Sequence, residues 1–405
     1  MVEVESINEI ITVEAFIVSR KELNDVMLKY NKVLLNKPKI PNIIDLNKEY
    51  MTFSVIDLQK KVSKDKVICL LNSDFIENDF SEWFGAKNPN ILLGSCKIDV
   101  LESLGCERPE IYSWEFTEIF DLKLCLNFNY FSYKEILRKI LPSNCKIPTS
   151  FEIIGDILHL NLTEDLLIHK KIIGEVLYKK IKNIKSVVTK IGNISNEFRF
   201  FEMEVLEGDH DLNTKQIENG LIYFLDYSKM YWNSKLQSER KIILNYFKPN
   251  ETICDLFCGV GPFVIPALKK GCIVYANDLN KDAITYLKKN VVENKVNSSK
   301  IFIFNENAFS LIKTLKTQNT TVNHFILNLP EKSLLFFKEI VSLNFNSMIH
   351  CYFFCKEFIQ PWEFVYNEIS IEIPKSNFEM IRSVSPSKNM WKITIKLHEI
   401  EKSNF

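Results

Sequence analysis

The fold is decided by the stretch CDLFCGVGPFVIPALKKGCIVYANDLN, residues 254–280. An apolar strand leads into a loop with Gly259 and Gly261, an apolar helix follows, and a second strand ends at Asp278. Only 11 of the 405 residues are glycine, so this pair indicates a backbone that turns sharply or approaches a ligand closely. This order predicts a βαβ unit of a parallel sheet, with a ligand site where the first strand ends.

The same alternation continues toward the end of the chain. Strands are expected at 252–257, 272–278, 300–305, 323–330 and 347–355, and helices at 262–270, 281–295, 309–316 and 331–341. FEMIRSV (378–384) and MWKITIKL (390–397) are joined by SPSKN, which predicts an antiparallel hairpin. The fold class is therefore α/β, with a Rossmann-like domain at 241–405 whose mostly parallel sheet is closed by this C-terminal hairpin.

The chain before residue 241 predicts two smaller α/β accessory domains, at 1–130 and 131–240. The second is expected to begin with a helix that Pro142 ends, followed by two strands around a turn at Gly155 and Asp156. A lysine-rich helix is then expected at 168–190, with lysines at positions 170, 171, 179, 180, 182, 185 and 190. Such a basic stripe follows a phosphate backbone or is a solvated helix face, and the sequence leaves both open.

Composition excludes several classes of protein. Lys plus Arg and Asp plus Glu both number 51, so a nucleic-acid partner would need a local basic face. The ten cysteines have no zinc-type spacing, so we expect no metal site and a reducing, intracellular environment. No apolar run has the length that spans a membrane, and the acids near the N-terminus are untypical of a secretory or transit peptide. The expected compartments are cytoplasm, nucleus or mitochondrial matrix.

The loop after the first strand is unsuited to phosphate. A dinucleotide fingerprint needs a third glycine, which is missing, and Pro262 removes a backbone N–H where a phosphate would need a donor. Asp278 ends the next strand and can accept hydrogen bonds from both hydroxyls of a ribose. Adenosine without a bound phosphate indicates S-adenosylmethionine, and the turn Asn328-Leu329-Pro330 can face a methyl donor and an acceptor base. The sequence therefore predicts a methyltransferase.

Longer motifs carry a resemblance that covers the chain from about Tyr130 to Leu397. In order they are EILRKILP, IGDILHLNL, NEFRFFEMEVLEGD, DYSKMYWNSKLQSER, DLFCGVGPF, ANDLN, NLP and IRSVSPSKNMW. On these residues the chain resembles the class I tRNA (guanine-37-N1)-methyltransferases of eukaryotes and archaea. The resemblance implies a Rossmann-like class I methyltransferase domain, S-adenosylmethionine as cofactor, and a monomer. It also implies tRNA as partner, contacted through its anticodon loop and its body.

The resemblance implies roles for particular residues. Glu239 is the general base that removes the proton from N1 of guanine, Arg199 stabilises charge on O6, and Asn328 orients the base. The implied cofactor contacts are Asp255, Phe257, Gly259, Gly261, Pro262, Asp278, Leu279, Asn280, Asn307, Ala308, Asn328 and Pro330. The implied substrate contacts are Tyr231, Trp232, Asn233, Lys235, Pro330, Lys179 and Lys180.

The sequence departs from the family pattern at two positions. Asn307 stands where the family has an acid on the adenine amine, and its amide oxygen can accept the same hydrogen bond. Cys258 stands where many relatives have alanine.

Alternatives stay open. Without the resemblance, Glu239 is a helix-surface acid paired with Lys235, and Tyr231 and Trp232 are core residues. Two competing functions are transfer of the aminocarboxypropyl group of S-adenosylmethionine to the modified base at the same tRNA position, and RNA binding without catalysis.

Overall fold

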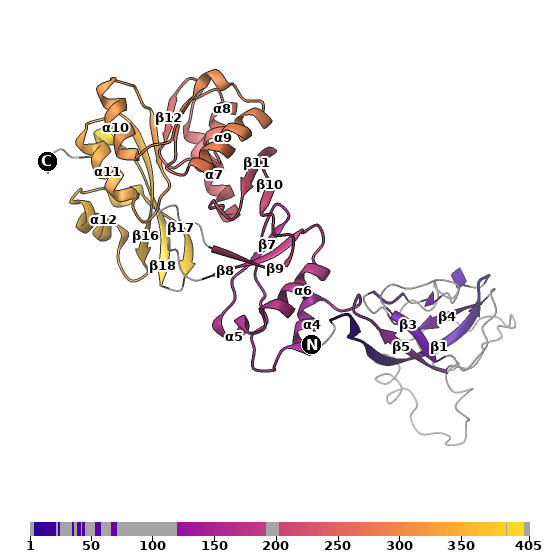
Figure 1. Cartoon of the computed structure of the whole chain (residues 1–405). Helices are drawn as coiled ribbons and strands as arrows, with labels where there is room; N and C mark the ends of the chain where they lie inside the picture. The colour runs from indigo at the N-terminus through magenta and orange to yellow at the C-terminus, as the bar shows by residue number, and fades with distance from the viewer. Residues whose placement is uncertain are drawn as a thin grey trace, which may run out of the picture. The chain divides into compact units, whose positions relative to one another are not determined.

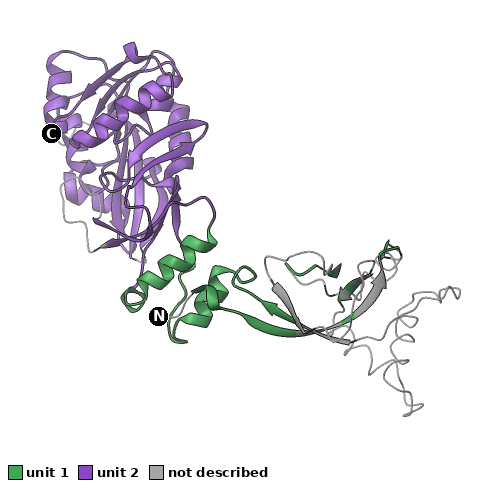
Figure 2. Ribbon diagram, turned by 45° about the vertical axis from the view of Figure 1, so that its right-hand side comes forward, with its two compact units in different colours: residues 1–149, 164–181 green, residues 150–163, 182–405 purple. Residues whose placement is uncertain are grey.

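The fold is that of a computed structural model, which describes residues 4–21, 23–24, 35, 39–41, 43–44, 53–57, 66–70, 120–191, 202–385 and 387–400. Two compact units divide the chain, one formed by 1–149 with 164–181 and the other by 150–163 with 182–405 (Figure 2). The chain therefore crosses between the units three times. The domain boundaries expected at residues 130 and 240 stay a prediction.

The first unit combines an antiparallel sheet with helices. Its strands are β1 (Glu9–Ser19), β2 (Ile43–Ile44), β3 (Phe53–Asp57), β4 (Lys66–Leu70) and β5 (Phe120–Leu126), in the order β2-β4-β1-β5-β3. Its helices are α4 (Tyr133–Ile140), α5 (Glu164–Leu167) and α6 (Lys170–Lys180). The helix α4 begins where Ser132 and Glu135 form a capping box, and it ends before Pro142 as expected.

The lysine-rich segment differs from the expected single helix. The helix α6 ends at Lys180, and Ser186–Ile191 forms strand β8. The β-branched run at 187–189 explains the change, because such side chains favour a pleated strand. Lys179 pairs with Glu175 at 2.8 Å, and Lys180 donates to the Phe128 main-chain oxygen at 2.9 Å. The lysines therefore do not follow one helix face.

The second unit begins with a small sheet and a hairpin. Strands β6 (Glu152–Ile154) and β7 (Ile157–Leu160) pair around the expected turn, and β8 and β9 (Glu202–Gly208) complete the order β6-β7-β8-β9. The hairpin consists of β10 (Asn213–Glu218) and β11 (Leu221–Asp226).

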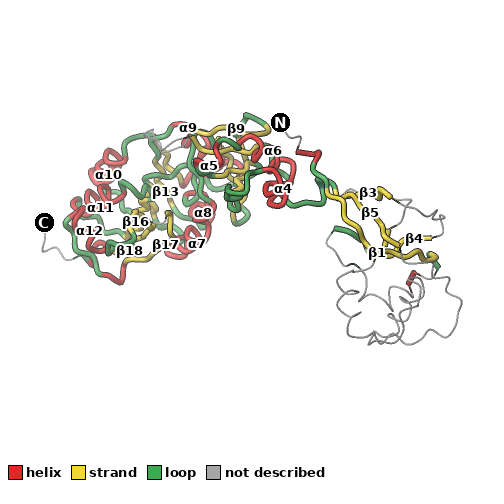
Figure 3. The backbone as a smooth tube through the Cα atoms, turned by 90° about the horizontal axis from the view of Figure 1, so that it is seen from below, coloured by secondary structure: helices red, strands yellow, loops and turns green. Residues whose placement is uncertain are grey.

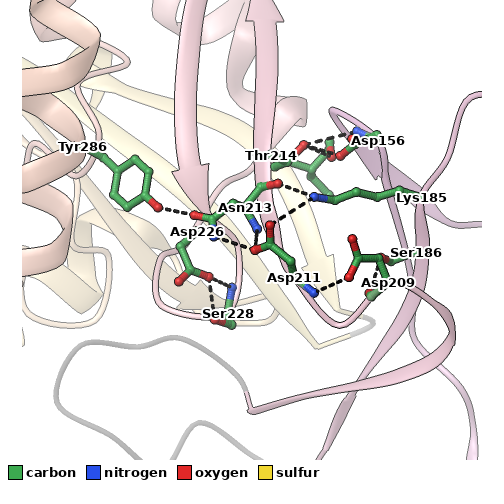
Figure 4. A network of polar contacts seen from close by, with 11 residues as sticks. Asp156, Lys185, Ser186, Asp209, Asp211, Asn213, Thr214, Asp226, Ser228 and Tyr286 are labelled. Carbon is green, nitrogen blue, oxygen red and sulfur yellow. Dashed lines mark hydrogen bonds and ion pairs between the residues drawn. The ribbon is translucent and has the colours of Figure 1, made fainter.

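A polar network holds the start of this hairpin (Figure 4). The main-chain oxygen of Asn213 accepts from Lys185 Nζ at 2.5 Å, and its N–H donates to Asp211 Oδ1 at 3.0 Å. Tyr286, on helix α9 (Lys281–Glu293), donates its hydroxyl to Asn213 Oδ1. Because Lys185 precedes β8, the network ties the small sheet, the hairpin and α9 together.

The side chains of Asn290, on α9, and of Asn294, the residue that follows α9, bind the free edge of β11. The Asn290 amide accepts from the Phe224 N–H at 2.8 Å and donates to the Phe224 oxygen at 3.1 Å. The Asn294 amide makes the same pair of bonds with Ile222, at 2.8 and 2.6 Å. Asn290 Nδ2 also donates to the Val260 oxygen at 3.0 Å, so one buried side chain joins the hairpin to the glycine loop.

The main sheet has seven strands and confirms the expected fold class. Its strands are β12 (Thr252–Asp255), β13 (Ile273–Asn277), β14 (Ile301–Phe304), β15 (His324–Leu327), β16 (Met348–Lys356), β17 (Phe378–Ser385) and β18 (Lys388–Lys396). The order is β14-β13-β12-β15-β16-β18-β17, and β12 to β16 pair in parallel. The hairpin β17–β18 joins β16 in antiparallel register.

Helices cover both faces of this sheet (Figures 1 and 3). One face carries α7 (Gln237–Tyr246), α8 (Val264–Lys269) and α9, and the other carries α10 (Ala308–Thr317), α11 (Ser333–Ser342) and α12 (Pro361–Ile369). Successive residues of a strand point to opposite faces of the sheet. Ile253 of β12 packs in the apolar core with α7, α8 and α9, whereas Cys254 packs in the core with α10, α11 and α12. The helix α12 follows β16 and precedes β17 along the chain, and it was not predicted from the sequence.

Candidate active site

Three neighbouring strand ends carry predicted cofactor residues. Asp255 is the last residue of β12, Asp278 follows β13, and Asn328 follows β15. Because β12 pairs in parallel with β13 on one side and β15 on the other, these strands end at the same edge of the sheet. The chain order reverses here, which is where open α/β sheets bind ligands.

The loop after β12 requires both of its glycines. Gly259 has φ +52° and Gly261 has φ +97°, in the left-handed region that L side chains rarely adopt. A Cβ at Gly261 would lie 2.6 Å from Leu287 Cδ1 of α9, whereas a Cβ at Gly259 would have no neighbour within 4 Å. Gly261 therefore lets the loop pack against α9, and Gly259 leaves open space on the other side.

The Asp278 carboxylate faces this loop. Its Oδ2 accepts from the Gly259 N–H at 2.8 Å, and its Oδ1 accepts from the Asn280 N–H at 2.9 Å. Burial raises the pKa of Asp278, and these two hydrogen bonds oppose the rise. Each oxygen has one protein donor and retains capacity for another, as the two hydroxyls of a ribose would require.

Asp255 has a buried oxygen without a partner. The residue is 1% exposed, its Oδ1 accepts from the Phe257 N–H at 3.2 Å, and its Oδ2 makes no hydrogen bond to any described residue. Burial raises the pKa of Asp255 to about 8, and the Asp278 charge adds to the rise. Because buried polar atoms are nearly always paired, this oxygen indicates a place for a hydrogen-bond donor or a cation.

The side chain of Ser333 holds the Asn328-Leu329-Pro330 turn in place. This buried hydroxyl accepts from the Leu329 N–H at 3.0 Å and donates to the Leu327 oxygen at 2.9 Å. The Pro330 oxygen accepts from the Phe354 N–H of β16 at 3.2 Å. The turn therefore has a defined position, and the half-buried Asn328 amide makes no hydrogen bond within the described part of the chain.

Glu239, on α7, is a buried acid with two donors on one oxygen. It is 5% exposed, and its Oε1 accepts from Tyr352 Oη at 2.8 Å and from Lys392 Nζ at 2.7 Å. Its Oε2 makes no hydrogen bond to the residues that the structure describes. The alternative of a helix-surface acid paired with Lys235 is not what the structure has, because Glu239 is buried and its cationic partner is Lys392 of β18.

Tyr352 links Glu239 to the glycine loop. Its hydroxyl donates to Glu239, and its ring centroid lies 6.4 Å from that of Phe263, the residue after Pro262. Two positions further along β16, the main-chain N–H of Phe354 donates to the main-chain oxygen of Pro330. Strand β16 thus connects Glu239, the glycine loop and the Asn328 turn.

The aromatic pair before α7 divides into one exposed and one buried ring. Trp232 is 4% exposed, donates its ring N–H to Ser234 at 3.1 Å, and lies under the Arg240 guanidinium. Tyr231 is 59% exposed, and its hydroxyl accepts from the Asn233 amide at 2.9 Å. Of the two, Tyr231 is free to stack on a base and Trp232 belongs to the core.

The remaining predicted residues have the following places. Asn280 and Asn307 cap α9 and α10 through bonds to the N–H groups two residues ahead, at 3.0 and 2.9 Å. Asn233 Oδ1 accepts from the Lys235 N–H at 3.0 Å. Leu279 is exposed, Ala308 is buried, and Phe257 packs on Phe336.

Three predicted residues are not part of this arrangement. Arg199 lies outside the described residues, and Lys179 and Lys180 belong to the other unit.

Sequence reasoning missed Tyr352 and Lys392. A signal existed for the lysine, because it interrupts the apolar run of β18, a strand with neighbours on both sides. A charged side chain there needs a buried counter-ion.

Two kinds of feature are absent from the described residues. Histidine, cysteine and acidic side chains there form no cluster suited to a metal ion. The helices there are all too short or too polar to span a membrane.

Comparisons with protein-family models match two segments of the chain. The TRM5/TYW2 methyltransferase domain matches residues 214–378, and the TYW2 N-terminal domain matches residues 133–211.

Solved structures share the fold. The complex of aTrm5 with tRNALeu has a TM-score of 0.63 at 21% identity and covers 94% of this chain and 99% of its own. Wild-type Trm5b from Pyrococcus abyssi has a TM-score of 0.57 at 23% identity, covering 95% and 99%.

Curated relatives are more similar in sequence. The tRNA (guanine(37)-N(1))-methyltransferase of Encephalitozoon cuniculi is 36% identical over 389 residues, which cover 96% of each chain. Those of Dictyostelium discoideum and Homo sapiens are each 37% identical, over 70% and 74% of this chain and 65% and 62% of their own. On this similarity, the chain belongs to the tRNA (guanine(37)-N(1))-methyltransferase family.

Proposed function

We propose that this protein methylates N1 of guanosine 37 in tRNA, with S-adenosylmethionine as methyl donor and Glu239 as proton acceptor. The observation that carries the proposal is the buried Glu239 carboxylate, which Tyr352 joins to the glycine loop. Family membership supports the same reaction, since the curated relatives bear its name.

The residues at the strand ends fit S-adenosylmethionine. Its methyl group is bound to a positively charged sulfur and is therefore electrophilic. The Asp278 carboxylate would accept from the ribose hydroxyls, and the open space at Gly259 would admit the nucleoside. The unpaired Oδ2 of Asp255 suits the amino group of the methionine portion. Asn307 keeps one lone pair of its amide oxygen for the adenine amine, although the other already caps α10.

Guanine N1 carries a proton and is a poor nucleophile until that proton leaves. Glu239 Oε2 would accept it, because Oε1 already holds two donors. The N1–H bond would break as the proton binds Oε2. The electron pair of N1 would then bond the methyl carbon while the bond between that carbon and sulfur breaks, which leaves a neutral thioether. Negative charge then develops on O6, where a cation or a preorganised donor is needed. Arg199 stays the predicted residue for that role.

The acceptor base has to leave the anticodon loop to meet a donor at the strand ends. Asn328 would orient it through its unpaired amide, Pro330 would shape its pocket, and the exposed Tyr231 ring would stack on it. Asn233 and Lys235 would adjoin the base, and Lys179 and Lys180 the tRNA body. We further propose that the protein acts as a monomer inside the cell, in the cytoplasm, nucleus or mitochondrial matrix.

The test is methyl transfer from labelled S-adenosylmethionine to two tRNA transcripts that differ only in guanosine or adenosine at position 37. The modified nucleoside is identified by mass spectrometry. We expect label on the guanosine transcript alone, as N1-methylguanosine. Binding of the cofactor with no label on either transcript would overturn the proposal and favour aminocarboxypropyl transfer or silent RNA binding.

A further inference from the structure

We propose that Lys392 is a positioning residue, which keeps Glu239 ionised and leaves its Oε2 as the single oxygen that can take the substrate proton. The inference rests on the proposed function of Glu239 and adds a residue to it. Lys392 is 1% exposed, and it lies on β18 between β16 and β17.

The geometry fixes one half of the carboxylate. Lys392 Nζ lies 2.7 Å from Glu239 Oε1, and the Tyr352 hydroxyl lies 2.8 Å from the same oxygen. Two donors from two different strands prevent the carboxylate from rotating freely. Oε2, which binds none of the described residues, is the oxygen left for an incoming proton.

The charge of Lys392 opposes the effect of burial on Glu239. Burial disfavours the charged form of a carboxyl group, and a protonated acid cannot act as the base. An ammonium group at hydrogen-bond distance favours the carboxylate. Burial also opposes the charge of Lys392 itself, but its hydrogen bonds to Glu239 and Glu379 outweigh burial and raise its pKa.

Glu379 gives Lys392 a second partner throughout the reaction. Its Oε2 lies 2.8 Å from Lys392 Nζ, and its side chain is 55% exposed. When Glu239 accepts the proton from N1 it becomes neutral, and a lysine with no other acid would then be a buried cation without a counter-ion. The Glu379 carboxylate prevents this, so the protonated state of Glu239 is reached without an unpaired charge.

The other ionisable groups around Glu239 and Lys392 are either neutral or already paired with another residue. Tyr352 stays a neutral donor, because burial and the Glu239 charge raise its pKa. Arg240, next to Glu239 on α7, makes two bonds to Glu218. Burial, His324 and Lys392 lower the pKa of His350 well below its usual value, so it is neutral. Within the described residues, Lys392 is the cation in contact with Glu239.

The test compares Lys392→Met with Lys392→Arg in the full chain. Single-turnover methyl transfer to the guanosine transcript is measured against pH at saturating S-adenosylmethionine, together with the Kd of the cofactor. We expect Lys392→Met to move the acid limb of the profile up by about one pH unit, so that the rate falls by up to about 10-fold on that limb and changes little well above it. Lys392→Arg is expected to keep the limb near its original pH, and the Kd is expected to change little.

Two more variants keep the inference decidable. In a Glu239→Gln background, Lys392→Met is expected to cause no further loss of rate, because it acts through Glu239. If Lys392→Met does not fold, Glu379→Gln replaces it, and the limb is expected to move down because one negative charge near Glu239 is removed. An acid limb that stays fixed overturns the role of Lys392, whereas no transfer by the unaltered protein overturns the proposed function instead.

Discussion

The two oxygens of Glu239 have different surroundings, and this decides what its replacement should do. Glu239→Gln keeps the shape and a hydrogen-bonding group but cannot accept the N1 proton. We expect turnover on the guanosine transcript to fall about 10²-fold or more, with the cofactor Kd nearly unchanged. Glu368→Gln, an exposed change on α12, is the matched control. A Glu239→Gln enzyme with normal turnover would refute Glu239 as the base.

Asp255 should show a trade-off between stability and cofactor binding. Its pKa is raised to about 8 in the folded protein. The folded state therefore holds a proton that the unfolded state loses near pH 4, and this raised pKa removes stability as pH rises from about 4 to 8. Asp255→Asn has no such titration.

We expect the melting temperature of Asp255→Asn, relative to the unaltered protein, to increase between pH 5 and pH 8. Cofactor binding at pH 8, measured by calorimetry, should weaken because the negative charge is lost. Asp282→Asn, an exposed acid on α9, serves as control and should show neither effect. A pH-independent difference in melting temperature for Asp255→Asn would contradict the assignment.

At the scale of elements, α9 holds the hairpin and the glycine loop together through Asn290. Asn290→Ala leaves the Phe224 N–H, the Phe224 oxygen and the Val260 oxygen without this partner. We expect a loss on the order of 2–4 kcal/mol in the free energy of unfolding in urea, together with weaker cofactor binding. Asn294→Ala is the control, since Asn294 binds β11 but not Val260. Equal cofactor affinity in both variants would argue against a role for the Val260 contact.

Apart from α12, the order of strands and helices from 252 to 397 could be predicted because each is a distinct apolar or amphipathic segment. The predicted site residues Asp255, Asp278 and Asn328 come together because they follow adjacent parallel strands. The helix α12 could not be found this way, since its aromatic and β-branched residues are weak helix formers. The bond between Lys392 and Glu239 joins positions 153 residues apart, and no local pattern encodes it.

At the scale of the whole molecule, a buried chain of polar groups makes stability depend on pH. His324 Nε2 lies 3.3 Å from Glu251, His324 Nδ1 lies 3.2 Å from His350 Nε2, and His350 Nδ1 lies 3.3 Å from Thr394. Neutral rings satisfy the chain when each histidine has its hydrogen on Nε2, as inferred from the partners. The pKa of both histidines is lowered, chiefly by burial.

A lowered histidine pKa gives stability that is present above about pH 6.5 and is lost as pH falls below it. We expect the contribution of the two histidines to the melting temperature to fall between pH 7 and pH 5, against the opposite contribution of Asp255. His350→Gln should have a lower melting temperature at pH 7, because the hydrogen-bonded chain is interrupted. Its melting temperature should fall less than that of the unaltered protein when the pH is lowered. His398 lies outside this hydrogen-bonded chain, so the melting temperature of His398→Gln should change with pH as that of the unaltered protein does. Identical pH slopes for His350→Gln and the unaltered protein would exclude the buried pair as the cause.

Asn290 and Asn294, at the end of α9, also affect how two copies of this protein would interact. A strand edge with free N–H and C=O groups is a template on which another chain can add a strand and begin to aggregate. At the edge of β11 that faces α9, the groups of Ile222 and Phe224 are already taken by side-chain amides of the same molecule. A helix thus occupies the place of a neighbouring strand, and that edge of the small hairpin is closed to recruitment by a second copy.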